Sequence, residues 1–483
     1  MSVTGVIPSM RPHWADRDLP TIAAAGLTGG IAAVFIWISP WMFGLVLAGI
    51  VFSLAFNESQ GIIVLILAYL LPINVVLGAD WGIRDAGLFI KFALTTGYFF
   101  GRMVKSNFRW RELLQSPAAK ANVLFVAAVA VSVILGIPGE MRAQLRGVFF
   151  VATYFGVLLL IADWARAPQQ ARRIVSATLI TSIPVGIFGF FQKAVGGNDA
   201  LWGAMYRGVV LQRYEYVGRP PSFFGHPTAF GSYLVLILTL ALSCIFLSDD
   251  RDLRRIAIWA TGVGAISLLI TESRGPMMGM AIVLVLMVLC FARGFAWKSL
   301  FLATLAGAVI LTVNVYSRWD SGGRFQAASA DTSLLSRVVL WGMALKMFQA
   351  SPIHGYGIGM FTYVQQGFLP SFVLSPIDLE VHNVYLELLA ETGAIGLVGF
   401  LLMLFVFAMA GRKALHANDS LSRVLGFTAF AGTAGVAVFS VFDQNILWSE
   451  QVASRYWLLA GLLIASESWK IQPGVREALS QRT

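Results

Sequence analysis

The segment 378-DLEVHNVYLELLAETGAIGLVGFLLMLFVF-407 decides the fold, because it places titratable residues at the head of a long apolar run. A helix needs about 20 apolar residues to cross a bilayer, and the run supplies them. Charged groups inside a span are costly and usually mark a function. The titratable residues at the head of this run are Asp378, Glu380, His382, Glu387 and Glu391.

The composition of the whole chain is typical of a membrane protein. Of 483 residues, 57% are hydrophobic and 12% are charged, and the mean hydropathy is +0.74. Soluble domains carry roughly a quarter charged residues. We therefore predict an all-α polytopic membrane protein with about 12–14 transmembrane helices. The candidate spans are 20–38, 40–56, 60–78, 86–104, 121–138, 145–162, 172–193, 227–247, 255–272, 275–292, 297–316, 382–410, 421–442 and 446–466.

Basic residues predict the orientation of these spans. With a cytoplasmic N-terminus, the cytoplasmic segments hold most of the Lys and Arg residues, as the positive-inside rule requires. Both termini are then cytoplasmic, and in a bacterium the chain lies in the inner (cytoplasmic) membrane. Basic loops thus explain the net charge of +10 without nucleic acid binding. The polar N-terminus predicts no cleavable signal peptide, and Cys244 and Cys290 predict neither a disulfide framework nor a zinc site.

Two long outer segments, 194–226 and 317–381, divide the chain, and both face the periplasm in this topology. We expect three parts: N-terminal transmembrane helices over 1–193, a catalytic region over 194–445, and a last transmembrane helix with a cytoplasmic tail over 446–483. Both loops are basic on the side where the positive-inside rule depletes basic charge. Long loops cross regardless of charge, so this charge either is incidental or meets an anion such as a lipid-linked diphosphate.

The larger loop contains the stretch SLLSRVVLWGMALKMFQA, from Ser333 to Ala350. Its apolar residues predict an amphipathic helix along the membrane surface, with Arg337 and Lys346 at polar positions. Asp331, Thr332 or Ser333 would cap its start, and Pro352 with the glycines that follow would end it.

Three sequence features fall on the outer side of the membrane. The segment 219-RPPSFFGHPTAFGSY-233 leads from the first long loop into a span. The segment 271-TESRGPMMGM-280 is a tight turn, in which Gly275 and Pro276 follow Arg274. The third feature is His382, at the head of its span.

These features resemble the O-antigen ligase and polymerase superfamily of membrane glycosyltransferases, which use glycans linked to undecaprenyl diphosphate. The resemblance rests on the Ser-Arg-Gly turn at 273–275, on 336-SRVVLWGMAL-345 with 352-PIHGYGIGMF-361, and on 382-HNVYLELLAETGAIG-396. The order, spacing and common sidedness of these motifs carry the resemblance, which covers residues 219–445. The N-terminal spans contribute only their hydropathy.

The resemblance implies a role for four residues. His382 corresponds to the histidine that activates the acceptor hydroxyl. Arg274 and Arg219 correspond to arginines that bind the diphosphate of the donor, and Arg337 matches a further basic position. The sequence departs from the family at His354, where an apolar residue is expected before the glycines, so a second histidine in the site is possible.

The chemistry of these residue types agrees with that assignment. Planar guanidinium groups stabilise the negative charge that develops on a departing diphosphate. Histidine titrates near neutral pH, as a base for a hydroxyl should. We therefore expect metal-independent catalysis without a cofactor. A cation site at Asp378 and Glu380 is the rival hypothesis, whereas the acidic run Asp249, Asp250 and Asp252 lies on the cytoplasmic side.

Structural roles compete with these assignments. His382 is also suited to anchor a helix end, and Arg274 or Arg219 to extend toward the membrane surface. His226 most simply starts the helix that continues with Pro227.

Glu387 and Glu391 are expected to be structural or to support the site indirectly. At 100° per residue, they lie about 140° and 180° around the helix from His382. They would then face a neighbouring helix, where Lys91 and Arg455 are possible counter-charges.

The sequence favours a periplasm-facing, inverting glycosyltransferase of surface polysaccharide biosynthesis. Its acceptor would be lipid A core (an O-antigen ligase), another lipid-linked repeat unit (a polymerase of O-antigen or exopolysaccharide) or a protein hydroxyl (a protein O-oligosaccharyltransferase). A flippase of lipid-linked oligosaccharides is the competing class. Transporters usually show internal repeats and broken helices at the midplane of the bilayer, whereas the polar residues here gather at the outer ends of spans.

Overall fold

The computed structural model describes residues 49–53, 86–105, 108, 110–136, 140–195, 219–224, 226–291, 327–369 and 380–469. Every regular element within these ranges is a helix. Eight of the helices are long and apolar enough to cross a membrane: α7, α8, α9, α11, α12, α13, α17 and α18. The predicted all-α, multi-pass membrane fold is confirmed.

The described helices fall into a long group and a short group. The long ones are α5 (Ala86–Val104), α7 (Pro117–Leu135), α8 (Met141–Trp164), α9 (Pro168–Val195), α11 (Pro227–Leu247), α12 (Arg251–Ile270), α13 (Arg274–Phe291), α15 (Ala327–Ala350), α17 (Val384–Ala414), α18 (Ser420–Phe439) and α20 (Glu450–Trp469). The short ones are α6 (Trp110–Leu113), α16 (Phe361–Val364) and α19 (Asn445–Trp448).

The helices lie where hydropathy predicts spans. The predicted spans 86–104 and 227–247 coincide with α5 and α11, and the other described spans agree within about one turn at each end. One boundary differs in kind, because residues 446–448 belong to the separate short helix α19. The predicted spans 20–38, 60–78 and 297–316 lie outside the described residues, as does most of 40–56. The predicted total therefore stays a prediction.

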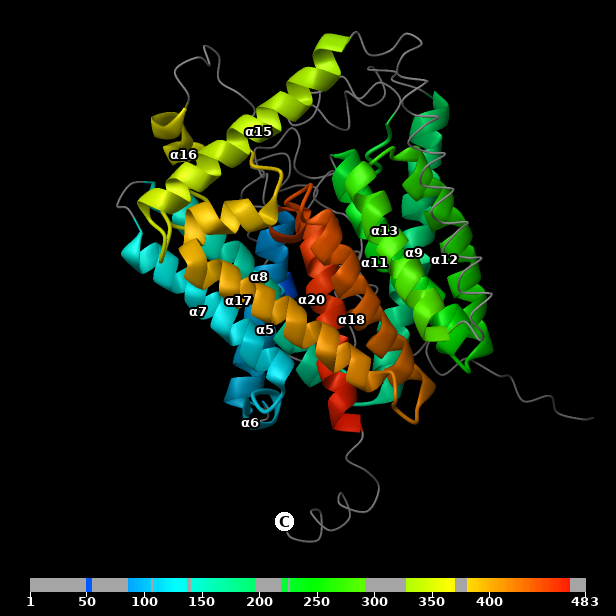
Figure 1. Ribbon diagram of the computed structural model, residues 1–483. Coiled ribbons are helices and arrows are strands. Elements are labelled where there is room, and N and C mark those ends of the chain that lie inside the picture. Colours follow the sequence, from blue (N-terminus) through cyan, green and yellow to red (C-terminus); the bar gives the residue numbers. More distant parts are fainter. Residues whose placement is uncertain are drawn as a thin grey trace, which may run out of the picture.

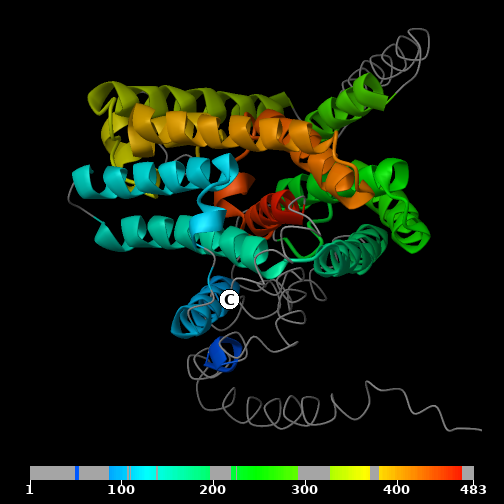
Figure 2. The ribbon, with the colours of Figure 1, turned by 90° about the horizontal axis from the view of Figure 1, so that it is seen from below.

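Helix α20 forms the centre of the bundle. All of its residues from Val452 to Ser466 are buried, and it packs against α8, α18, α11 and α17 (Figures 1 and 2). Its central position explains how it accommodates polar residues. The buried indole N–H of Trp457 donates to Asn122 of α7 at 3.0 Å.

One end of the bundle is fixed by a buried carboxylate. Asp163, at the end of α8, is fully buried and accepts hydrogen bonds from Tyr98 at 2.6 Å and from Arg102 at 3.2 Å. Arg166 adds a contact at 3.3 Å. A buried carboxylate is stable only when paired and hydrogen-bonded, so this cluster ties the ends of α5 and α8 together.

The acidic run 249–252 lies at the same end and has a structural role. Asp250 caps α12 by accepting the backbone N–H groups of Asp252 and Leu253. Its hydrogen bond from the Arg172 guanidinium lowers the pKa of Asp250 to about 2. Asp249 is paired with Arg423 at 3.6 Å.

Helix α17 is broken at Gly393, whose φ of 63° and ψ of −165° are not helical. In a continuous helix, the N–H groups of Ala394 and Ile395 would bond to the carbonyls of Ala390 and Glu391. Here the loop between α15 and α16 satisfies all four groups. Its Tyr356 and Gly357 N–H groups bond to those two carbonyls, and its Pro352 and Ile353 carbonyls accept the two N–H groups, at 2.7–3.3 Å.

Helix α15 is the predicted helix of the larger loop, and it crosses over the end of the bundle (Figure 1). Leu340, Met343, Ala344 and Met347 form its buried apolar face, while Lys346 is exposed. It ends at Ala350, before Pro352, as expected. The predicted cap at Asp331, Thr332 or Ser333 is wrong, because the helix already includes residues 327–330.

Replacing Gly393 by alanine is expected to destabilise the fold. An added Cβ would lie 2.4 Å from the Ile353 backbone, and the positive φ alone costs on the order of 1–3 kcal/mol for a residue with a side chain. We expect a clearly lower unfolding midpoint for purified Gly393→Ala in detergent.

Gly342→Ala is the matched control, because Gly342 lies in α15 with no heavy atom within 4 Å of an added Cβ. Alanine is favoured over glycine inside a helix by about 1 kcal/mol, so the control should match or exceed the wild-type midpoint. Equal midpoints for Gly393→Ala and the wild type would contradict this account of the break.

Candidate active site

His382 lies immediately before α17 and not within it. Its φ is 52°, an uncommon value for a residue with a side chain. The helix starts with Asn383, whose side chain accepts the N–H groups of Tyr385 and Leu386 at 3.0 and 3.1 Å. The half-buried imidazole therefore projects from a cap and not from a helix face, so the angles estimated for Glu387 and Glu391 around a helix that includes His382 do not apply.

Arg219 reaches the turn between α12 and α13 that carries Arg274. Its Nε donates to the Thr271 carbonyl at 3.0 Å and its Nη2 to the Ser273 hydroxyl at 3.1 Å. Arg274 follows as the first residue of α13, with an exposed side chain. The structure thus brings these two predicted arginines to one turn.

The segment that carries Arg219 is held on α9. Gln192 exchanges two hydrogen bonds with the backbone of Ser222, at 2.7 and 3.1 Å. The Ser222 hydroxyl donates to the Val185 carbonyl at 2.7 Å, and Phe223 stacks on Phe188 with a centroid separation of 4.2 Å. These contacts fix the chain on both sides of Ser222, whose φ is 52°.

The end of α18 joins the arginine turn to His382. The Val384 N–H donates to the Ser440 carbonyl at 3.0 Å. On the other side, an added Cβ on Gly275 would lie 3.2 Å from Phe442 Cβ. His382 lies two residues before Val384, and Arg274 lies directly before Gly275. Both therefore lie near residues 440–442.

Arg337 approaches from α15. One turn after it, the indole N–H of Trp341 donates to the Val381 carbonyl at 3.0 Å, directly before His382. Residues four apart share a helix face, so half-buried Arg337 lies on the same side of α15 as that contact. The structure therefore gathers all four predicted site residues at one end of the bundle.

Glu391 has a different partner from the predicted one. It is 1% exposed, and its carboxylate accepts the backbone N–H groups of Gly359 and Phe361, both at 2.8 Å. Among the described residues, no cation contacts it, and its partners belong to a loop rather than to a neighbouring helix.

Glu387 binds the short helix α19. Its Oε1 accepts the indole N–H of Trp448 at 2.8 Å, while its buried Oε2 has no hydrogen-bond partner within the described part of the chain. The suggested counter-charges lie elsewhere, because Lys91 pairs with Glu450 and Arg455 lies 5.6 Å from the Tyr233 ring centroid. The prediction that Lys91 and Arg455 neutralise the two glutamates is wrong.

The remaining histidines of interest take structural positions. His226 caps α11 by accepting the Thr228 N–H at 3.1 Å, as predicted. The Nδ1 atom of His354 lies 2.9 Å from the Gly355 carbonyl, within the loop that fills the break in α17.

The cation site suggested at Asp378 and Glu380 falls only partly within the described residues. Asp378 lies outside the described residues, and Glu380 is exposed. Within the described ranges, no group of three or more His, Cys, Asp or Glu residues is placed to hold a metal ion.

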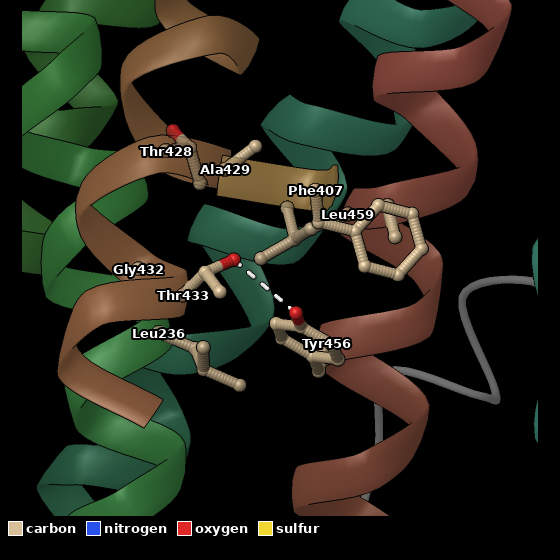
Figure 3. Close-up of a pocket in the computed structure, with 9 residues that line it drawn as sticks. Leu236, Phe407, Thr428, Ala429, Gly432, Thr433, Tyr456 and Leu459 are labelled. Atoms are coloured by element: carbon tan, nitrogen blue, oxygen red, sulfur yellow. Dashed lines mark hydrogen bonds between the residues drawn. The ribbon is translucent and has the colours of Figure 1, made fainter. Parts of the chain in front are cut away.

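A small cavity inside the bundle is separate from this site (Figure 3). It lies between α11, α17, α18 and α20 and has a volume of about 10 Å³, enough for one water molecule. Thr433 and Tyr456 line it and hydrogen-bond to each other at 3.2 Å. It is too small for a glycan.

Several supporting residues are absent from the sequence-based site. Trp341 lies inside a quoted motif, where its indole N–H was the available signal. Gln192, Ser440 and Trp448 act through backbone or side-chain partners far away in sequence, which a single sequence does not reveal.

Part of the chain that carries the site matches a known protein family. The O-antigen ligase family matches residues 259–401, a range that includes Arg274, Arg337 and His382. The predicted resemblance to the O-antigen ligase and polymerase superfamily is confirmed. Arg219 lies outside the match and is placed beside it by its contacts with Thr271 and Ser273.

A curated relative gives a second comparison. The chain is 26% identical over 300 residues to the exopolysaccharide production protein ExoQ of Rhizobium meliloti (strain 1021). The alignment covers 56% of this chain and 66% of the length of that protein. The O-antigen ligase match lies in the C-terminal half of the chain, with three of the four predicted site residues.

Proposed function

We propose that the chain is a membrane glycosyltransferase of surface polysaccharide biosynthesis. It would transfer a glycan from undecaprenyl diphosphate to an acceptor hydroxyl. The observation that carries this proposal is the convergence of His382 with Arg219, Arg274 and Arg337 at one end of the bundle. The O-antigen ligase match over 259–401 supports it.

The residues fit a single displacement at the anomeric carbon. His382 takes the proton of the acceptor hydroxyl as its oxygen forms the new bond to that carbon. The bond from the carbon to the diphosphate breaks, and its electron pair leaves with the lipid diphosphate. Arg219 and Arg274 would hold the diphosphate and offset its growing charge. Attack opposite the leaving group inverts the anomeric configuration.

The site is proposed to face the periplasm from the inner membrane, with both termini in the cytoplasm. The energy for transfer would be stored in the diphosphate linkage of the donor, because no ATP is available there. The guanidinium groups supply the positive charge that a metal ion would otherwise bring, so the mechanism is proposed to be metal-independent and to use no cofactor.

The acceptor separates three activities. A repeat unit on a second lipid would make the chain a polymerase, and the name of the ExoQ relative favours this case for an exopolysaccharide. Lipid A core would make it a ligase, as the name of the matching family suggests. A protein hydroxyl would make it an O-oligosaccharyltransferase.

A flippase of lipid-linked oligosaccharides is the second candidate. The buried ion pair between Lys91 and Glu450 favours it, because ionisable groups inside spans often line transport paths. Both residues lie near the ends of α5 and α20 that adjoin the site. The ion pair is therefore equally suited to stabilise the helix ends next to the site.

A reconstituted assay decides between these classes. The purified chain in vesicles is given an undecaprenyl-diphosphate glycan and, separately, each of the three acceptor types. A glycan product together with released lipid diphosphate is expected with one acceptor. Movement of the donor across the bilayer, with no product from any acceptor, would contradict the proposal and support a flippase.

Replacing Arg274 by lysine is expected to abolish most transfer. Lysine keeps the charge but presents a point ammonium instead of a planar fork, and losing one such donor costs on the order of 100-fold or more in rate. Initial rates at saturating donor measure the effect. Arg255→Lys, an exposed position paired with Asp252 at the opposite end, should keep wild-type rates. An equally active Arg274→Lys would remove the diphosphate role.

Chelation is expected to leave the transfer rate unchanged. EDTA is added to the assay before the donor, and rates are compared with untreated enzyme. A rate that falls with EDTA and returns with a divalent cation would contradict metal independence. It would revive the cation site suggested at Asp378 and Glu380.

A further inference from the structure

The carboxylate of Glu391 is enclosed by a loop that neither the family match nor the proposed chemistry explains. One of its oxygens accepts the Gly359 N–H and the other accepts the Phe361 N–H, both at 2.8 Å. Hydrogen bonds to a buried charged acceptor are stronger than those between neutral groups. Both oxygens of this buried group therefore serve to hold the loop.

The loop, residues 352–361, fits its place by close backbone approach. An added Cβ on Gly355 would lie 2.4 Å from the Glu391 backbone. On the opposite side, added Cβ atoms on Gly357 and Gly359 would lie 2.9 Å from Gln144 and from the Ala143 carbonyl of α8. All three glycines have a positive φ. The loop is thus held between α17 and α8 in a conformation that few other residues allow.

The same loop carries α15. Tyr356, Met360 and Phe361 pack against the buried face of α15 in a hydrophobic cluster separate from the main core. Val381 and Ala390 complete this cluster from the α17 side. The cluster links α15 to the loop as well as to α17, so the contacts that fix the loop also help to hold α15.

Helix α15 in turn contacts the segment that carries the proposed base. Its Trp341 donates to the Val381 carbonyl, directly before His382. Arg337 lies one turn earlier on the same helix. A shift of the loop would therefore change how Arg337 and His382 lie relative to each other.

We propose that Glu391 is a positioning residue: its carboxylate fixes the 352–361 loop, which holds α15 with Arg337 against the segment that carries His382. This inference rests on the glycosyltransferase function proposed above. Glu391 takes no part in proton transfer in this account, since both of its oxygens are occupied by backbone donors.

The carboxylate is required because two N–H donors face it. A glutamine has one carbonyl oxygen, and its NH₂ group would face an N–H donor without an acceptor. Glu387, one turn earlier on the same helix, is the matched control. Among the residues that the structure describes, only its Oε1 is bonded, to Trp448, and Glu387→Gln keeps that bond.

The test compares Glu391→Gln with Glu387→Gln in the purified full-length chain. Backbone amide exchange is followed over residues 352–361 and along α15. In parallel, donor binding, kcat and the donor KM are measured with the acceptor found active for the wild type. In Glu391→Gln we expect exchange at Gly359 or Phe361 to rise at least about 10-fold, because the amide that faces the new NH₂ group loses its acceptor.

The kinetic result distinguishes positioning from stability. We expect kcat of Glu391→Gln to fall about 10- to 100-fold, as small misplacements of reacting groups do, with donor binding changed less than about threefold. Glu387→Gln should match the wild type in exchange and in kcat. A lower unfolding midpoint with unchanged kcat per folded molecule would overturn the proposal, and so would unchanged loop exchange.

A variant that does not fold and a wild-type chain that transfers no glycan are two further outcomes, and each has its own reading. If Glu391→Gln does not fold, Glu391→Asp keeps the charge but is one methylene short, and the same loop exchange and loss of kcat are expected. Wild-type chain that transfers no glycan would refute the proposed function. Loop exchange that rises in that case would leave Glu391 with a structural role alone, which overturns the positioning role.

Discussion

The break in α17 at Gly393 is the constraint on which the site depends. Inside a bilayer, every backbone N–H and C=O group needs a partner within the protein. Breaking a spanning helix leaves such groups unbonded, and here the 352–361 loop supplies their partners residue by residue. The loop between α15 and α16 is therefore an integral part of the helix bundle. The packing of this loop against α15 holds α15 at the end of the bundle where His382 lies.

The site combines two halves that meet at the end of α18. One half contains Arg219 and Arg274, fixed by the turn 271–274 and by the Gln192 contacts with Ser222. The other half contains His382 and Arg337, joined through Trp341 and Val381. Two arginines in one half, and an imidazole with a third arginine in the other, suit a reaction with an anionic leaving group and a hydroxyl nucleophile.

Hydropathy predicts the spans well because burial in lipid requires long apolar runs with few exceptions. The same pattern also predicts that His382 and the arginines lie at one end of the bundle, while the side of the membrane that this end faces stays a prediction. The start of α17 was also within reach of the sequence, since Asn383 is a preferred N-cap residue and excludes His382 from the helix.

The partners of the two glutamates were not predictable in the same way. Glu391 binds backbone N–H groups, which every residue except proline offers, so its sequence context gives no signal. Glu387 and Lys91 bind residues far away in the chain, Trp448 and Glu450. Pairing opposite charges by type alone therefore gave the wrong partners. The non-helical conformation of Gly393 depends on the loop that packs against it, which is a tertiary effect.

The most direct test of the account is transfer by His382→Ala in the reconstituted assay, with His416→Ala as the control histidine in the turn between α17 and α18 at the opposite end. Loss of a general base lowers the rate by about 100-fold or more. The account predicts this loss for His382→Ala, with donor binding and unfolding midpoint retained and with the control fully active. Undiminished transfer by His382→Ala would contradict it and leave His382 as a group that only anchors the start of α17.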